Sequence, residues 1–177
     1  MVSYAFESFN LKPGEALIAR VSDVFSSAIL YNPPKLNDGI KDALEALEKD
    51  FKLAIVSDTG FSPGKTLRSL LNTESILHFF SAFSFSDETG FSKPSPESFN
   101  FAIRQFDGGN ITPQECIHIG DNARTDISGA KQLGMRAIHY TGDESNLLVN
   151  REQMSEIPSD FTSTSWYDIV NWISKNA

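Results

Sequence analysis

Four short apolar runs alternate along this chain with stretches of helical periodicity, and this alternation restricts the fold more than any other feature. The runs are KLAIVS at 52–57, AFSFS at 82–86, ECIHIG at 115–120 and MRAIHY at 135–140. Each run is too short for a helix, and KLAIVS in particular is typical of a strand buried on both faces. Repeated strand–helix units predict an α/β fold in which helices cover both faces of a parallel sheet.

The N-terminal part of the chain carries two amphipathic stretches instead of apolar runs. Residues 13–30 place Leu17 and Val21 at helical spacing after a Pro-Gly start. After the Pro-rich break YNPPKLND, residues 39–50 place Leu44 and other apolar residues on one face. We therefore expect two helices joined by a linker before the first strand.

The acidic composition narrows the range of partners. The 177 residues include 15 Lys and Arg against 23 Asp and Glu, a formal net charge of −8, with no basic cluster. This balance argues against nucleic acid and anionic membranes as partners. A single cysteine, Cys116, and the absence of a leader-like or membrane-spanning apolar run favour a cytoplasmic protein. The sequence leaves the oligomeric state open.

Polar side chains follow the apolar runs, at the strand ends where parallel-sheet proteins bind their ligands. Ser57 and Asp58 follow the first run, Lys93 lies in the loop after the second, and Asp121 follows the third, with Asp126 shortly behind. Carboxylates suit Mg²⁺, while an ammonium and a hydroxyl suit phosphoryl oxygens. Taken singly, each residue has an ordinary alternative as a helix cap or a surface charge. Their shared position after strands favours a site for phosphate and a divalent cation.

Three segments resemble, in the correct order, motifs of the haloacid dehalogenase (HAD)-like hydrolase superfamily, which is dominated by phosphohydrolases. KLAIVSDTG resembles its second motif, TGFSKPSPESF its third and HIGDNARTDISGAKQLGM its fourth. The resemblance implies a Rossmann-like core, a three-layer α/β fold with a parallel sheet flanked by helices, at residues 33–177. Residues 1–32 would then be the remnant of an N-terminal helical cap with its linker.

The same resemblance implies roles for the residues after the strands. Ser57 would bind the phosphoryl group, Lys93 would position and neutralise it, and Asp121 would ligate Mg²⁺. Asp126 would be a second metal ligand or would orient the first. Asp58 also belongs to the implied phosphate site, although its carboxylate would repel a phosphate unless it points away or meets the metal. The implied reaction is hydrolysis of a small phosphorylated metabolite through an aspartyl-phosphate intermediate.

The superfamily's first motif, an apolar strand ending in Asp-x-Asp that supplies the nucleophile, has no counterpart in this sequence. Only Asp23 precedes Asp38, and it lies within a helical pattern. In the superfamily this strand lies between those that bear Ser57 and Asp121, so its loss predicts a gap in the sheet. We expect an N-terminally truncated form of a longer phosphohydrolase. The alternative is a complete, non-catalytic binding or regulatory module whose sheet is closed by residues 1–12 or by a partner's strand.

The remaining candidate residues favour packing roles. His118 and His139 lie within predicted strands, and Cys116 is typical of a small buried residue. In a two-component receiver domain the acidic pair comes first in the chain. Here the hydroxyl precedes the lysine and the acidic pair comes last, which excludes such a domain. No G-x-G-x-x-G follows an apolar run, which excludes a dinucleotide-binding site of that kind.

Overall fold

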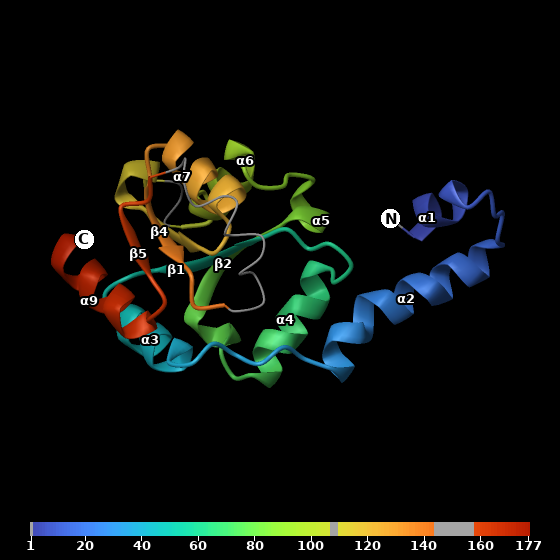
Figure 1. The fold of residues 1–177 in the computed structure, drawn as a ribbon, viewed down its shortest axis with the longest axis horizontal. Helices are drawn as coiled ribbons and strands as arrows, with labels where there is room; N and C mark the ends of the chain where they lie inside the picture. Colours follow the sequence, from blue (N-terminus) through green and yellow to red (C-terminus); the bar gives the residue numbers. More distant parts are fainter. Residues whose placement is uncertain (1, 107–109, 144–157) are drawn as a thin grey trace.

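The computed structural model describes residues 2–106, 110–143 and 158–177. Two helices, α1 (Val2–Ser8) and α2 (Glu15–Tyr31), form an arm that projects from an α/β body (Figure 1). The strands of the body are β1 (Leu53–Ser57), β2 (Phe80–Phe85), β3 (Ile117–Gly120), β4 (Arg136–Tyr140) and β5 (Phe161–Ser163). Its helical elements are α3 (Ile40–Leu47), α4 (Gly64–Thr73), η1 (Leu77–Phe79), α5 (Ser86–Thr89), α6 (Pro96–Ile103), η3 (Pro113–Glu115), the π-helical turn η4 (Ala123–Ile127), α7 (Ser128–Gln132) and α9 (Trp166–Asn176).

The strands of the described residues form two separate parallel sheets. In one sheet β1 pairs with β2, so that Ser57 lies opposite Phe85. In the other sheet β4 lies between β3 and β5, with Ile119 opposite Ile138. Both sheets are parallel throughout, which confirms the predicted α/β class. In the part of the chain that the structure describes, β1 and β3 belong to different sheets and do not pair with each other.

Two apolar clusters hold the two sheets together, one on each face. The first contains residues of α6, η4, α7 and β4, and its buried members are Phe99, Ile103, Ile127, Ala130, Met135 and Ala137. The second contains residues of α3, α9 and β4, and its buried members are Leu47, Ile138, Tyr140, Ile169 and Ile173. Val56 of β1 packs against the first cluster and Leu53 of β1 against the second. Because each cluster joins helices to strands of both sheets, the body has the expected three layers.

The structure corrects the prediction that the strand at 52–57 is buried on both faces. Every residue of β1 and of β3 is only partly buried, whereas Ala137, Ile138, His139 and Tyr140 of β4 are buried. The reason is that β1 and β3 border a cavity between the two sheets, while β4 has a strand on each side.

The structure also argues against closure of the sheet by the chain's own N-terminal segment. Residues 2–8 form helix α1, which contacts α2 on the projecting arm (Figure 1). A helix satisfies its backbone hydrogen bonds internally and cannot pair with a strand edge. The version of the alternative in which residues 1–12 form the closing strand is therefore wrong for this structure.

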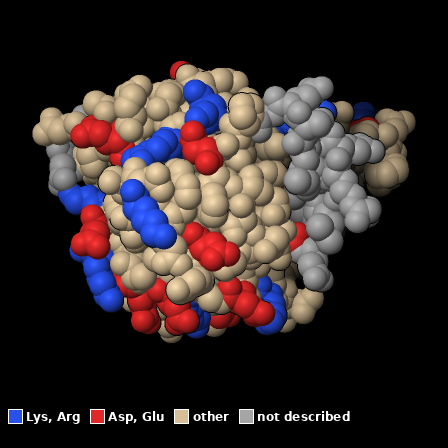
Figure 2. Space-filling view, turned by 60° about the vertical axis from the view of Figure 1, so that its left-hand side comes forward, with Lys and Arg blue, Asp and Glu red and all other residues tan. Residues whose placement is uncertain are grey.

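The surface drawn in Figure 2 carries both signs of charge. Lys and Arg side chains lie among Asp and Glu side chains on this face, without a large area of one sign. Within the described ranges, no helix has both the length and the apolar character needed to cross a membrane.

Candidate active site at the carboxyl ends of the strands

Lys93 connects the loops that follow three strands. Its backbone N–H donates to Asp58 Oδ1, with N and O 3.0 Å apart, and its ammonium Nζ donates to Asp126 Oδ1 at 2.7 Å. Asp58 follows β1, Lys93 lies beyond β2, and Asp126 lies in η4 after β3. The structure therefore brings together three of the sequence-predicted residues, and it does so at the edge where the strands end.

Asp126 is the centre of this cluster. Its Oδ1 also contacts His118 Nε2 at 3.0 Å, and its Oδ2 accepts a hydrogen bond from the backbone N–H of Asn122 at 3.0 Å. The Asp126 side chain is 3% exposed and that of Lys93 is 14% exposed. Both carboxylate oxygens of Asp126 are therefore occupied by protein groups, and the ion pair with Lys93 is largely shielded from water.

The environment of Asp126 keeps its carboxyl ionised. Burial by itself raises the pKa of this group, because the charged form loses its hydration. The hydrogen bond from His118 and the charge of Lys93 outweigh burial, so the pKa of Asp126 lies well below its ordinary value. The ionised carboxylate of Asp126 is consequently the form that faces Lys93 at neutral pH.

The backbone around Gly120 and Asn122 makes this contact possible. A Cβ atom on Gly120 would lie 2.3 Å from Asp126 Cγ, so only glycine allows the aspartate to approach the end of β3. Asn122 Oδ1 accepts hydrogen bonds from the backbone N–H groups of Arg124 and Thr125 at 3.0 and 3.2 Å, which caps the start of η4. The local sequence thus turns the chain so that Asp126 points back at β3.

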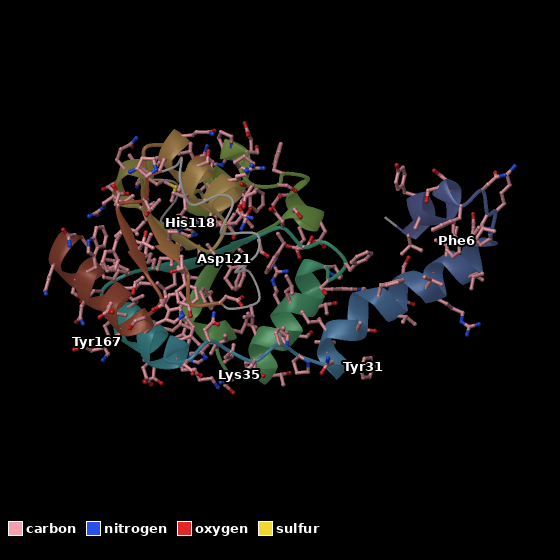
Figure 3. All side chains as sticks on the ribbon, viewed as in Figure 1. Phe6, Tyr31, Lys35, His118, Asp121 and Tyr167 are labelled. Carbon is pink, nitrogen blue, oxygen red and sulfur yellow. The ribbon has the colours of Figure 1, made fainter. Side chains whose placement is uncertain are left out.

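Asp121 has a different environment from Asp126. It is partly exposed and lines a cavity of about 290 Å³ at the ends of β3 and β4, together with Asn37, Gly120, Tyr140 and Asp143 among others. Its backbone carbonyl contacts His139 Nε2 at 3.0 Å, which fixes the peptide after β3. Figure 3 shows His118 and Asp121 in the body of the molecule, far from Phe6 on the arm. Asp121 is therefore placed where a ligand can reach it.

Ser57 and Asp58 lie at the matching end of β1. Ser57 is the last residue of the strand and is partly buried, while Asp58 is exposed. The hydrogen bond from the Lys93 backbone holds the Asp58 carboxylate against the loop after β2. This contact gives the Asp58 carboxylate a structural partner within the protein.

The carboxylates near the strand ends differ in how well they would suit a magnesium ion. No group of three or more His, Cys, Asp or Glu side chains within the described residues could hold a metal ion. Mg²⁺ takes an octahedral set of oxygen ligands and commonly uses one or two carboxylates, waters and substrate phosphate. Asp121 lines the cavity at the strand ends, whereas the carboxylate oxygens of Asp126 are bonded to Lys93, His118 and the Asn122 backbone.

His118 and Asn122 are site residues that sequence reasoning missed. The period of two along a strand places His118 on the same face as Gly120, and Gly120 is the residue that Asp126 approaches. Strand alternation together with the Gly-Asp motif could therefore have indicated a contact between His118 and Asp126. Asn122 carries an ordinary helix-cap signal, since Asn is among the preferred residues before a first helical turn.

Comparison with known proteins identifies relatives of this chain. The family profile described as haloacid dehalogenase-like hydrolase matches residues 5–134. An uncharacterized hydrolase of Schizosaccharomyces pombe is 32% identical over 123 residues, which are 68% of this chain and 51% of the relative. The glyceraldehyde 3-phosphate phosphatase of Pyrococcus furiosus is 33% identical over 103 residues, 58% of this chain and 40% of the relative. This chain spans about half the length of such curated relatives.

A solved structure gives the same fold. The HAD-hydrolase YfnB of Bacillus subtilis, solved bound to magnesium, superposes with a TM-score of 0.65 at 19% identity. The superposition covers 97% of this chain and 89% of YfnB. At this level of identity the likeness establishes the architecture of the body and leaves the chemistry to be argued from the residues.

Proposed function

Because this chain belongs to the haloacid dehalogenase-like hydrolase family, we propose that its cluster of strand-end residues is the phosphate-binding and metal-binding part of a phosphatase active site. The observation that carries the proposal is the ion pair of Lys93 with buried Asp126, held at the edge where Ser57 and Asp121 also lie. The proposed reaction is Mg²⁺-dependent hydrolysis of a small phosphate monoester. Relatives such as the glyceraldehyde 3-phosphate phosphatase of Pyrococcus furiosus support this class of substrate.

Lys93 would bind and neutralise the phosphoryl oxygens. The two hydrogen bonds of Lys93, from Nζ to Asp126 and from the backbone to Asp58, hold it in place before any substrate arrives. A donor that is positioned in advance stabilises developing charge without reorganising during the reaction. Of the two roles considered for Asp126, we favour that of a positioning residue for Lys93, because both of its oxygens are already bonded within the protein.

Ser57 and Asp121 would complete the contacts with the substrate group. Ser57 would donate its hydroxyl to a phosphoryl oxygen, and Asp121 would provide one carboxylate ligand to Mg²⁺. When bound, Mg²⁺ supplies electrostatic stabilisation of the charge on the transferring phosphoryl group. The single cysteine, Cys116, supports a reducing compartment such as the cytoplasm for this reaction.

The nucleophile would come from a segment outside these 177 residues. In the reaction we propose, an aspartate of that segment attacks phosphorus, the alcohol leaves, and water hydrolyses the resulting aspartyl-phosphate. Asp23, which precedes the first strand, lies on α2 in the arm and so cannot supply this group at the strand ends. The ratio of chain lengths supports a longer parent, in which residues 1–32 belong to a cap and residues 33–177 to the core.

The test begins with the source DNA upstream of the Met1 codon, translated in frame. We expect an apolar strand ending in Asp-x-Asp, and a protein that includes it should hydrolyse p-nitrophenyl phosphate with Mg²⁺. In that longer protein, Lys93→Met should lower kcat about 100-fold or more, as expected for loss of a transition-state contact. Lys131→Met is the control, because Lys131 forms an ion pair of similar length with Asp160, more exposed and away from the site.

Two outcomes would contradict the proposal. Sustained Mg²⁺-dependent turnover by the 177-residue chain alone would show that no outside nucleophile is needed. An in-frame stop directly upstream, combined with phosphate binding but no turnover, would favour the alternative of a non-catalytic binding or regulatory module.

A further inference from the structure

The loop after β1 is anchored to the body at one residue. Residues 58–63 connect Ser57, the last residue of β1, to α4, and within this stretch only Thr59 is buried, with 6% of its surface exposed. Its neighbours Asp58 and Gly60 are both exposed. The position of this loop beside the candidate site therefore depends on the contacts of Thr59.

Thr59 bonds to α5, the short helix that follows β2, through both its backbone and its hydroxyl. The backbone N–H of Thr59 donates to Ser86 Oγ, with N and O 3.0 Å apart. Thr59 Oγ1 accepts a hydrogen bond from the backbone N–H of Asp87 at 3.2 Å. Thr59 Oγ1 and Ser86 Oγ lie 3.1 Å apart and share a further hydrogen bond. These three bonds, which we call the Thr59–α5 contact, join the segments that follow β1 and β2.

Helix α5 is itself held against α4. The Asp87 carboxylate accepts a hydrogen bond from the backbone N–H of Gly64, the first residue of α4, at 3.0 Å. Glu88 forms an ion pair with Arg68 of α4, whose guanidinium lies 4.6 Å from the centre of the Phe85 ring. A Cβ atom on Gly64 would lie 2.6 Å from a ring carbon of Phe85, so only glycine allows α4 to begin this close to β2. These contacts fix α5, and with it the partner that Thr59 binds.

The Thr59–α5 contact lies, along the chain, between the two residues that we propose to bind phosphate. Ser57 precedes Thr59 by two residues, and Lys93 follows α5 after a short loop that begins at Gly90. The backbone N–H of Lys93 donates to Asp58 Oδ1 at 3.0 Å, so the same two segments are joined a second time. Because both junctions connect residues that follow β1 and β2, Ser57 and Lys93 belong to one structural unit.

Loss of the Thr59 hydroxyl would change the geometry of this unit. The backbone N–H of Asp87 would lose its acceptor, and a polar group left without a partner favours a rearrangement that satisfies it. The rearrangement would move residues 58–63, because Thr59 is their one buried member. A displacement of about 1 Å at a reacting group can lower a rate on the order of 100-fold. The positions of Ser57 and Lys93 therefore depend on a hydroxyl that is bonded to α5.

From these contacts we infer that Thr59 is a positioning residue of the proposed active site: its hydroxyl fixes the loop after β1 against α5, so that the Ser57 hydroxyl and the Lys93 ammonium reach the same phosphoryl group. The inference rests on the proposed function, which assigns that group to Ser57 and Lys93. Every bond of the Thr59–α5 contact lies at the ends of β1 and β2. This half of the site is therefore assembled without the segment that supplies the nucleophile.

The first measurement is amide hydrogen exchange on the 177-residue chain, which requires neither substrate nor Mg²⁺. Thr59→Val keeps the branched shape of the side chain and removes its hydroxyl. Exchange at the Asp87 and Lys93 amides should become about tenfold faster, because the hydroxyl bonds of the Thr59–α5 contact are lost, while the amides of β4 keep their rates. Thr59→Ser retains the hydroxyl and should leave exchange at both amides close to that of the native chain.

The second measurement compares kcat and KM in the longer protein of the proposed function, with p-nitrophenyl phosphate and Mg²⁺. Thr59→Val should lower kcat about tenfold and change KM by less than about threefold, because displaced donors lose contacts that strengthen in the transition state. Thr59→Ser should restore most of kcat. A purely structural role would lower the urea midpoint of Thr59→Val and leave kcat of the folded protein unchanged.

Thr66→Val is the matched control. Thr66 is 7% exposed, against 6% for Thr59, but it lies on α4 and its hydroxyl is not one of the atoms of the Thr59–α5 contact. This variant should leave kcat and the exchange rate of the Lys93 amide unchanged. Ser86→Ala should reproduce the loss of kcat caused by Thr59→Val. The double variant should lose much less than the product of the two single losses, because both changes break the same hydrogen bond.

The outcomes separate this inference from the proposed function. Unchanged exchange at the Lys93 amide in Thr59→Val would overturn the inference, whatever the activity. Faster exchange together with native kcat would also overturn it and would leave the proposed function intact. Independent losses of kcat in the double variant would show that the two hydroxyls act separately, which would overturn the role of their shared bond. A native kcat in Lys93→Met would instead contradict the proposed function itself, on which the inference rests.

Discussion

Strands β4 and β1 have similar sequences, RAIHY and LAIVS, but the structure buries them to different extents. In β4, Ala137 and Ile138 are fully buried, and the strand has β3 on one side and β5 on the other. In β1 every residue is partly exposed, and among the described strands only β2 pairs with it. An apolar run therefore indicates a strand that belongs in the interior, but the burial it reaches depends on neighbours along both edges.

The largest change in stability is expected from the ion pair of Lys93 with Asp126. This pair links the loop after β2 in one sheet to the loop after β3 in the other. Asp126→Asn leaves the Lys93 ammonium shielded from water without its counter-charge, and should lower the free energy of unfolding by about 3 to 5 kcal/mol. Urea denaturation at pH 7 measures the change. Asp160→Asn, in the more exposed pair with Lys131, should cost only about 1 kcal/mol. Equal losses of unfolding free energy for the two variants would show that the buried pair stabilises the fold no more than the exposed pair.

Alanine substitutions in the two strands compare their burial directly. Ile138→Ala should lower the free energy of unfolding by about 3 kcal/mol, since it removes a fully buried side chain from a packed cluster. Ile55→Ala in β1 should cost roughly 1 kcal/mol, because this side chain already borders the cavity between the two sheets. Denaturant unfolding of both variants at one temperature gives the comparison. A cost for Ile55→Ala as large as that for Ile138→Ala would mean that the cavity between the two sheets is closed in solution.

The order of the elements could be predicted from sequence, because it depends on local patterns. The runs at 52–57, 115–120 and 135–140 each contain an observed strand, and the run at 82–86 overlaps β2. Strand β5 and helix α1 were not predicted. Residues 161–163 are too few to show a period, and residues 2–8 show only weak alternation, which local hydrogen bonding resolves as a helix.

The candidate site could be predicted only in part. The rule that ligands bind beyond the carboxyl ends of parallel strands selects Ser57, Lys93 and Asp121 from the sequence. It does not reveal that Lys93 pairs with Asp126, because this contact joins loops of two different sheets and depends on how the helices pack across the faces of both sheets. It also does not distinguish Asp121 from Asp126, which have the same side chain and differ only in burial and partners.

Acidification should lower the free energy of unfolding by less than the Asp126→Asn substitution does. The folded-state pKa of Asp126 is depressed, so its contribution to stability is present above the unfolded-state pKa of about 3.9 and is lost as the pH falls below it. Urea midpoints measured between pH 7 and pH 3 should fall more steeply for the native chain than for Asp126→Asn. Identical profiles would show that Asp126 does not titrate as a paired carboxylate.

Helix α2 should give the smallest effect, and it extends the comparison from strands to helices. Both α2 and α3 were predicted from amphipathic spacing, but α3 buries Ala43, Leu44 and Leu47, while α2 has no buried residue. Val24 is 68% exposed, so Val24→Ser should change the free energy of unfolding by less than about 0.5 kcal/mol. Leu44→Ser in α3 is the matched control and should cost several times more, because it removes a buried apolar side chain. A loss above about 1 kcal/mol for Val24→Ser, growing with protein concentration, would instead show that the apolar face of α2 is covered by a second copy in solution.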